Sequence, residues 1–256
     1  MAKFQLEYIR HNSDLTDKED VDAALSSIPK DIFEAYKKTF TERVDGRTNK
    51  VILVWVVSWI LKGARPLRLH ELCSLIAVEK GVSALDRNIN SLLEVCQNFI
   101  TQSSGFVDFA HATVKEFFET KYEESPPLPS EADIARNCLK YLKSICTALD
   151  KHKEVDIPAR WSKTLPRAVC YEYKALGYVG RHWAFHTKKG EEDNNVQKAA
   201  LEILGPKRSR DSVLKIEAYM RKTEFVSGQS LLHIVAENGM TKICENVVWP
   251  KRRDGM

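Results

Sequence analysis

The sequence lacks the short motifs that mark the common catalytic sites. It contains no GxxxxGK[ST] run to hold nucleotide phosphates and no GxSxG elbow to present a nucleophilic serine. Gly63 and Gly81 are instead typical of helix ends, and Ser103 and Ser104 fall on a turn. We therefore expect that the chain is not an enzyme, and that it has neither a catalytic residue nor a cofactor of its own.

Metal-binding patterns are missing as well. The six cysteines lie far apart and form no CxxC pair, which favours reduced, partly buried thiols over a disulfide framework or a zinc site. His182 and His186 are four residues apart and share a helix face, but no HExxH glutamate accompanies them. We interpret these two histidines as packing or surface residues and expect no metal.

No apolar run is long enough to cross a bilayer. The longest one, Val51–Leu61, is interrupted by Ser58 and falls short of the about 18 to 20 residues that a span requires. The amino terminus, Met-Ala-Lys-Phe-Gln, has no apolar signal core. We expect no membrane contact, a cytoplasmic location, and a buried helix over 51–61 that places Trp55 and Trp59 in the core.

Charge of neither sign is in large excess. The 39 Lys and Arg residues are interleaved with 35 Asp and Glu residues, and the resulting net charge of +4 does not by itself imply a nucleic-acid partner. A chain of 256 residues that is 43% hydrophobic can bury a sizeable core. The protein is therefore expected to be folded rather than disordered throughout.

The first half of the chain shows a succession of helical patterns. Apolar residues at helical spacing predict a helix within 25–40, with Pro29 in its first turn, and a polar break follows at 41–49. After the helix at 51–61, the same periodicity predicts helices over 69–78 and 84–96.

A β-hairpin is predicted next. Phe99-Ile100 and Phe106–Phe109 are short apolar runs joined by the turn Ser103-Ser104-Gly105. Three helices followed by a hairpin is the order of a winged-helix domain. A further helix over 111–122 is expected to pack through Val114, Phe117 and Phe118.

The second half begins after a proline-rich linker, Glu123–Ser130. We predict helices over 132–149, 173–186 and 196–204, with a charged loop at 188–195 and a basic loop at 207–211. Trp161 and Trp249 lie in polar or proline-containing surroundings, so we expect Trp249 to be exposed.

These features resemble the fungal NACHT–ankyrin proteins of the STAND class (NLR-like receptors), in the region that follows their NTPase core. Four segments carry the resemblance in the family's order: Leu25–Tyr36, Trp59–Leu72, Phe109–Phe118 and Tyr178–His186. The second is similar to the family's A-x-R-P-L…E-L pattern and the third to its H-x-S-V-K-E-F pattern. The resemblance implies a winged helix of the GPI inositol-deacylase type.

A second resemblance lies near the carboxyl end. Gly228–Gly239 is similar to the opening of an ankyrin repeat, G-x-T-P-L-H-x-A-A-x-x-G, with Ser230, Leu231 and Val235 as departures. One repeat cannot bury its own apolar face, and about three are needed for a stable stack. The chain thus looks like a shortened relative, without the P-loop core before it and the array after it.

Together the sequence patterns and the two resemblances predict a mainly α protein with one small hairpin. Its expected parts are a helical segment at 1–45, the winged helix at 46–124, the linker at 125–130, a helical extension at 131–205, and a partial ankyrin repeat with tail at 206–256. The expected function is regulation or scaffolding through protein–protein contacts, with NACHT or ankyrin regions of related proteins as partners in signal transduction. A degraded gene product without an independent role is a further hypothesis.

The resemblance also implies a role for one residue, His111. In the parent class the matching winged-helix histidine reaches the β-phosphate of bound ADP, so His111 is a nucleotide-sensing candidate only if a NACHT core is present. The structural interpretation is a helix-start histidine that bonds the backbone. One hydrogen bond to a charged group contributes about 1.5 to 3 kcal/mol, whereas micromolar affinity requires about 8 kcal/mol. His111 alone therefore cannot bind ADP.

DNA binding is the alternative function, because winged helices commonly place their third helix in the major groove. That helix, within 84–96, carries Asp86, Arg87 and Glu94, and the hairpin region 97–109 carries Asp108 and no Lys or Arg. Phosphate contacts from Lys and Arg supply most non-specific DNA affinity, so this charge pattern argues against a nucleic-acid partner.

Overall fold

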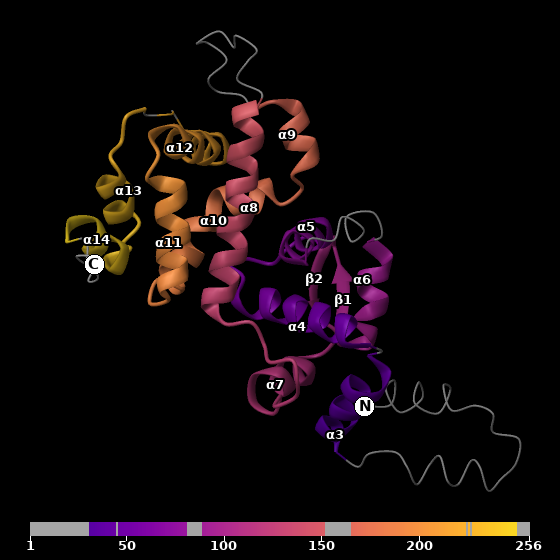
Figure 1. Ribbon diagram of the computed structural model, residues 1–256. Helices are drawn as coiled ribbons and strands as arrows, with labels where there is room; N and C mark the ends of the chain where they lie inside the picture. Colours follow the sequence, from indigo (N-terminus) through magenta and orange to yellow (C-terminus); the bar gives the residue numbers. More distant parts are fainter. Residues whose placement is uncertain are drawn as a thin grey trace, which may run out of the picture.

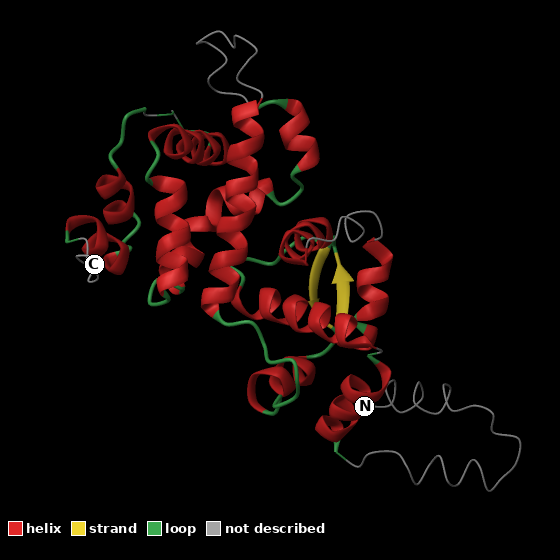
Figure 2. Ribbon diagram, in the orientation of Figure 1, coloured by secondary structure: helices red, strands yellow, loops and turns green. Residues whose placement is uncertain are grey.

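A computed structural model describes residues 31–44, 46–80, 89–151, 165–223, 225 and 227–249. Within them the protein is mainly helical with one two-stranded antiparallel sheet (Figure 2), as the sequence predicts. Helix α8 lies between two groups of elements: α4, α5, α6 and the sheet on one side, and α10, α11 and α12 on the other (Figure 1).

The leading helix α3 spans Ile32–Lys38 and continues as the π-helical turn η1 (Thr39–Arg43). Asp31 caps it by accepting a hydrogen bond from the Phe33 amide at 3.1 Å. The side chains of Tyr36 and Phe40 are buried against Phe117 and Tyr122, respectively. The predicted helix is confirmed from residue 32 onward, and its first part lies outside the described residues.

The apolar run beginning at Val51 forms the centre of helix α4, which spans Gly46–Lys62. Every residue from Ile52 to Trp59 is buried, so the prediction of a buried helix is confirmed. The polar break predicted at 41–49 is wrong in extent, because α4 begins at Gly46, five residues before Val51. The start of α4 also contacts the preceding turn, since Lys50 Nζ donates to the Thr41 carbonyl at 2.9 Å. None of the described helices is long and apolar enough to cross a membrane.

Helices α5 (Leu69–Lys80) and α6 (Ile89–Val95) follow α4. The first part of the helix predicted over 84–96 lies outside the described residues. The short 3-10 helix η2 (Gln97–Phe99) then leads into strand β1 (Ile100–Ser103), which pairs antiparallel with β2 (Phe106–Phe109). The predicted hairpin is therefore confirmed.

The turn of the hairpin depends on Ser104 and Gly105, whose φ angles are +52° and +83°. Two successive residues in this region give a turn whose twist matches that of the paired strands. A third segment pairs with β2, because the Val107 amide donates to the Leu67 carbonyl at 2.9 Å. The hairpin is thereby attached to the segment between α4 and α5.

Helix α7 (Ala112–Thr120) packs on α3 and β2 through Val114, Phe117 and Phe118, as predicted. Helix α8 (Glu131–Lys151) is the longest described helix, and its buried stripe includes Ile134, Cys138 and Leu142. It confirms the helix predicted over 132–149.

The helix predicted over 173–186 is wrong at its start. The chain forms α9 (Arg167–Glu172), bends at Tyr173, and starts α10 (Leu176–Lys189) three residues later. The bend is fixed because the Ala175 amide donates to the Tyr141 hydroxyl of α8 at 3.0 Å. Helix α11 (Asn194–Leu204) matches the prediction.

The basic loop predicted at 207–211 is also wrong, because these residues begin helix α12 (Lys207–Arg221). Pro206 precedes the first turn, where a proline is well tolerated, and Arg210 donates to the carbonyls of Leu204 and Gly205. Val213 and Ile216 are buried, so tertiary packing outweighs the local run of charges.

The described chain ends in two short successive helices, α13 (Leu231–Glu237) and α14 (Thr241–Val248). Ser230 caps α13 by accepting from the His233 amide at 3.1 Å. The two helices pack on each other, and α14 packs on α11. All six cysteines are free thiols, four buried and two partly buried, as expected.

Candidate functional site

His111 lies at the amino-terminal cap of α7, and its side chain is exposed. Its Nδ1 accepts a hydrogen bond from the Thr113 amide at 3.2 Å and lies 2.9 Å from Thr113 Oγ1. That hydroxyl is in turn 2.7 Å from the Tyr36 hydroxyl of α3. Within this chain His111 is thus a helix cap that ties α7 to α3.

The capping geometry leaves Nε2 of a neutral His111 as the ring nitrogen that carries the proton. A nucleotide contact would need an NTPase core beside α7, and it stays a prediction.

A second polar centre joins α10 to the turn after α4. The Tyr178 hydroxyl accepts a hydrogen bond from the Ala64 amide at 2.9 Å and lies 2.7 Å from His186 Nε2. His186 is fully buried, and Trp59 meets both rings edge-on, with centroid distances of 5.8 Å to Tyr178 and 5.3 Å to His186. We call Trp59, Tyr178 and His186 the α4–α10 cluster.

An ion pair borders this cluster. Arg65 donates to both carboxylate oxygens of Glu71, at 2.9 and 2.6 Å, and Glu71 also accepts from the Arg68 amide at 2.9 Å. The Arg65 guanidinium lies 4.9 Å from the centroid of the Tyr178 ring. Segments 59–72 and 178–186, two of the four that carry the family resemblance, therefore meet in space.

Burial sets the protonation state of the cluster. Burial, with a smaller contribution from the neighbouring His182, lowers the pKa of His186 to about 3, so the imidazole is neutral near pH 7. Burial likewise raises the pKa of the Tyr178 hydroxyl. The Nε2 atom of neutral His186 shares a hydrogen bond with the Tyr178 hydroxyl, and its buried Nδ1 has no hydrogen-bond partner among the described residues. Within the same residues, no three His, Cys, Asp or Glu side chains gather as metal ligands would.

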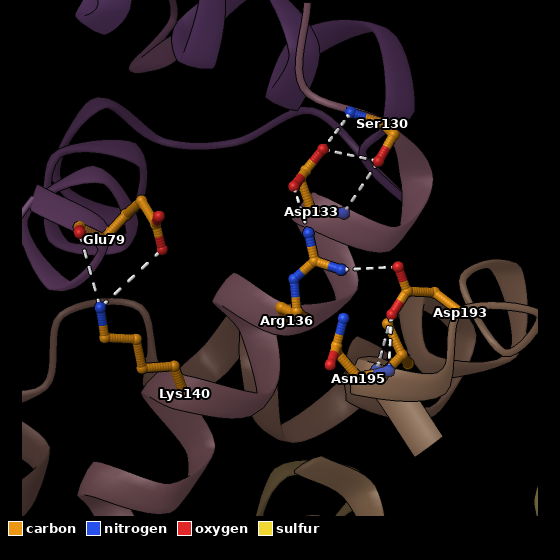
Figure 3. Close-up of polar contacts among 8 residues, drawn as sticks. Glu79, Ser130, Asp133, Arg136, Lys140, Asp193 and Asn195 are labelled. Carbon is orange, nitrogen blue, oxygen red and sulfur yellow. Dashed lines mark hydrogen bonds and ion pairs between the residues drawn. The ribbon is translucent and has the colours of Figure 1, made fainter. Parts of the chain in front are cut away.

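A third polar group, drawn in Figure 3, connects α8 to α11. Ser130 and Asp133 cap α8 reciprocally: the Asp133 amide donates to Ser130 Oγ at 3.1 Å and the Ser130 amide to Asp133 Oδ2 at 2.8 Å. Arg136 bonds Asp133 and also donates to Asp193 Oδ2 at 2.9 Å. Asp193 caps α11 through Asn195, so Arg136 links the starts of two helices.

A buried carboxylate attaches the last helix pair. Glu191, between α10 and α11, accepts from the Lys242 amide at 3.0 Å and from Thr241 Oγ1 at 3.3 Å, at the start of α14. Gln197 of α11 bonds both the Glu191 carbonyl, at 2.6 Å, and Asn246 of α14. The α13–α14 pair is therefore held on α11 by polar contacts.

The same helix pair also exposes apolar residues. Six large apolar side chains are exposed among the described residues, and three of them, Leu232, Val248 and Trp249, belong to 231–249. Trp249 is 74% exposed, as the sequence indicates. Trp161 lies outside the described residues. Exposed tryptophan and aliphatic side chains are typical of a protein-contact surface.

The chain matches no family model, no curated protein and no solved structure.

Proposed function

We propose that this chain is a non-catalytic regulatory or scaffolding segment of a NACHT–ankyrin type protein, acting through protein–protein contacts. The sequence resemblance supports a winged helix at 46–124, and three helices followed by a hairpin are the elements that such a domain needs. The ordered motifs support a signalling role, and the partners would be ankyrin or NACHT regions of related proteins.

The observation that carries the proposal is the exposure of three large apolar side chains within 231–249, the region of α13 and α14. The pair has the sequence pattern that opens an ankyrin repeat, and such a repeat buries its free apolar side only against a neighbouring repeat. Leu232, Val248 and Trp249 are the side chains left exposed there. We infer that the partner surface is a helix pair of an ankyrin array.

The variant Leu232→Ser/Val248→Ser/Trp249→Ser is expected to weaken binding to a recombinant array of three or more ankyrin repeats. The loss should be at least tenfold in Kd, because buried tryptophans often contribute more than 1 kcal/mol to an interface. Isothermal titration calorimetry of the full chain measures it.

The matched control is Tyr171→Ser, which removes an aromatic side chain that is 78% exposed on α9. This variant should bind the array as the unmodified chain does. Equal affinities for all three proteins, or no heat of binding with the unmodified chain, would reject the proposal.

The alternative of DNA binding gains no support from the described residues. Strands β1 and β2 contain one charged residue, Asp108, and no Lys or Arg. The one charged residue of α6 is Glu94. The Arg68 guanidinium lies 5.6 Å from the centroid of the Phe106 ring on the hairpin. One cation engaged with an aromatic ring is a poor substitute for the several phosphate contacts that DNA affinity requires.

A further inference from the structure

Helix α14 is capped by a residue that lies outside the helix. Within the described chain, Met240 occupies the N-cap position and contributes no side-chain hydrogen bond to α14. Glu191, 50 residues before Thr241, supplies the acceptors instead: its two carboxylate oxygens accept from the Lys242 amide at 3.0 Å and from Thr241 Oγ1 at 3.3 Å. A carboxylate that bonds a first-turn amide also lies at the positive end of the helix dipole, so Glu191 stabilises the start of α14.

The turn that carries Glu191 is fixed to α11. Gln197 Nε2 of α11 donates to the Glu191 carbonyl at 2.6 Å, and the Asp193 amide donates to the Gly190 carbonyl at 3.0 Å. Gln197 also bonds Asn246 of α14 through its Oε1. The cap is therefore held in position by elements that do not belong to the α13–α14 pair.

The fold of the pair depends on its attachment to the rest of the chain. Helices of seven and eight residues are too short to be stable alone in water. Their buried apolar side chains belong to the common core: Ile234, Val235, Met240 and Ile243. The attachment runs chiefly through α14, which packs on α11, whereas a pocket of about 360 Å³ opens between α12 and α13. Loss of the α14 cap should therefore loosen both helices.

We propose that the α13–α14 pair exchanges between a docked, folded form and a released, unfolded form, that the Glu191 cap sets the balance, and that the ankyrin array binds the docked form alone. The choice of partner rests on the function proposed above. Leu232, Val248 and Trp249 keep fixed positions only while both helices are folded on α11. The array and the Glu191 cap then stabilise the same form, although Glu191 is only 8% exposed and offers a partner little surface.

Hydrogen–deuterium exchange of the full chain tests the role of the cap. Glu191→Ala removes both bonds and should speed the exchange of α13 and α14 amides about tenfold, as the loss of a capping side chain does. Glu191→Gln keeps a side-chain oxygen that can accept from the Lys242 amide, so it should restore part of the protection. Unchanged exchange in α4 and α8 checks that the variants are otherwise folded.

The matched control is Asp31→Ala, which removes a capping carboxylate from another short helix. Asp31 accepts from the Phe33 amide of α3 at 3.1 Å. This variant should exchange in α13 and α14 as the unmodified chain does.

The ankyrin array provides the second arm of the experiment. A saturating array of three or more repeats should return exchange in α13 and α14 of Glu191→Ala to slow rates, because binding favours the docked form. Persistent fast exchange in that complex would show that the array does not select the docked form.

Two further results separate this inference from the proposed function. Unchanged exchange of α13 and α14 in free Glu191→Ala would overturn the inference, whether or not the array binds. An array that does not bind the unmodified chain would reject the proposed function and the selection of the docked form, while exchange in the free variants would still decide whether Glu191 holds the pair.

Discussion

Replacing Trp59 by alanine is expected to lower the free energy of unfolding by about 3 to 5 kcal/mol, the usual cost of truncating a buried tryptophan. Trp59 has no exposed surface, and its ring contacts Tyr178 and His186 of α10. The substitution removes packing at the contact between α4 and α10 and leaves a cavity there. Urea denaturation monitored by circular dichroism measures the change.

Trp249→Ala is the matched control, because it removes the same side chain from a position that is 74% exposed. It should change the free energy of unfolding by less than about 0.5 kcal/mol, as surface substitutions usually do. If the two tryptophan variants were equally stable, α4 would not be the buried centre of the fold.

The second large effect expected is a loss of stability in acid that depends on His186. Its pKa is about 3 in the folded protein, where burial disfavours the charged ring, and an unfolded histidine titrates near about 6.5. Above about pH 6.5 the imidazole is neutral in both the folded and the unfolded protein, so its titration does not change the free energy of unfolding. Below it the unfolded state binds the extra proton, so stability falls by about 1.4 kcal/mol per pH unit until about pH 3.

At pH 4.5 this contribution amounts to about 2 to 3 kcal/mol. The measurement is the free energy of unfolding at pH 7 and pH 4.5 for the unmodified chain and for His186→Gln, whose side chain does not titrate. The variant should be less stable at pH 7 but lose less stability on acidification. Equal acid losses in His186→Gln and the unmodified chain would show that His186 is not buried and neutral.

The sequence predicts the elements whose apolar pattern is strong. The run from Val51 has no polar face, so a helix over it must be buried on all sides. Gly105 supplies the positive φ that the hairpin turn needs. The predicted interpretation of His111 as a helix-start residue that bonds the backbone is confirmed by its contact with the Thr113 amide.

Elements that depend on tertiary contacts are harder to predict. The residues 207–211 are charged in four of five positions, yet they begin α12 because the rest of that helix packs on α10. A close approach permits this packing: a Cβ added at Gly180 would lie 2.8 Å from Ile216 Cγ2. The residues around position 207 do not indicate that α12 packs on α10.

Single polar residues that join helices are even harder to identify from the sequence. Asn137 is fully buried on α8, and its Nδ2 donates to the Leu75 carbonyl of α5 at 2.9 Å. Glu191 lies in a charged stretch that reads as a solvated loop, although its carboxylate is buried at the start of α14. Each depends on a partner at least 50 residues away, which periodicity alone cannot identify.

Hydrogen–deuterium exchange of the full chain, alone and with a saturating ankyrin array, tests the proposed function most directly. Backbone amides in α13 and α14 should exchange more slowly when the array is present, and exchange in α4 and α10 should not change. Unchanged exchange throughout α13 and α14, or protection confined to the hairpin, would contradict it.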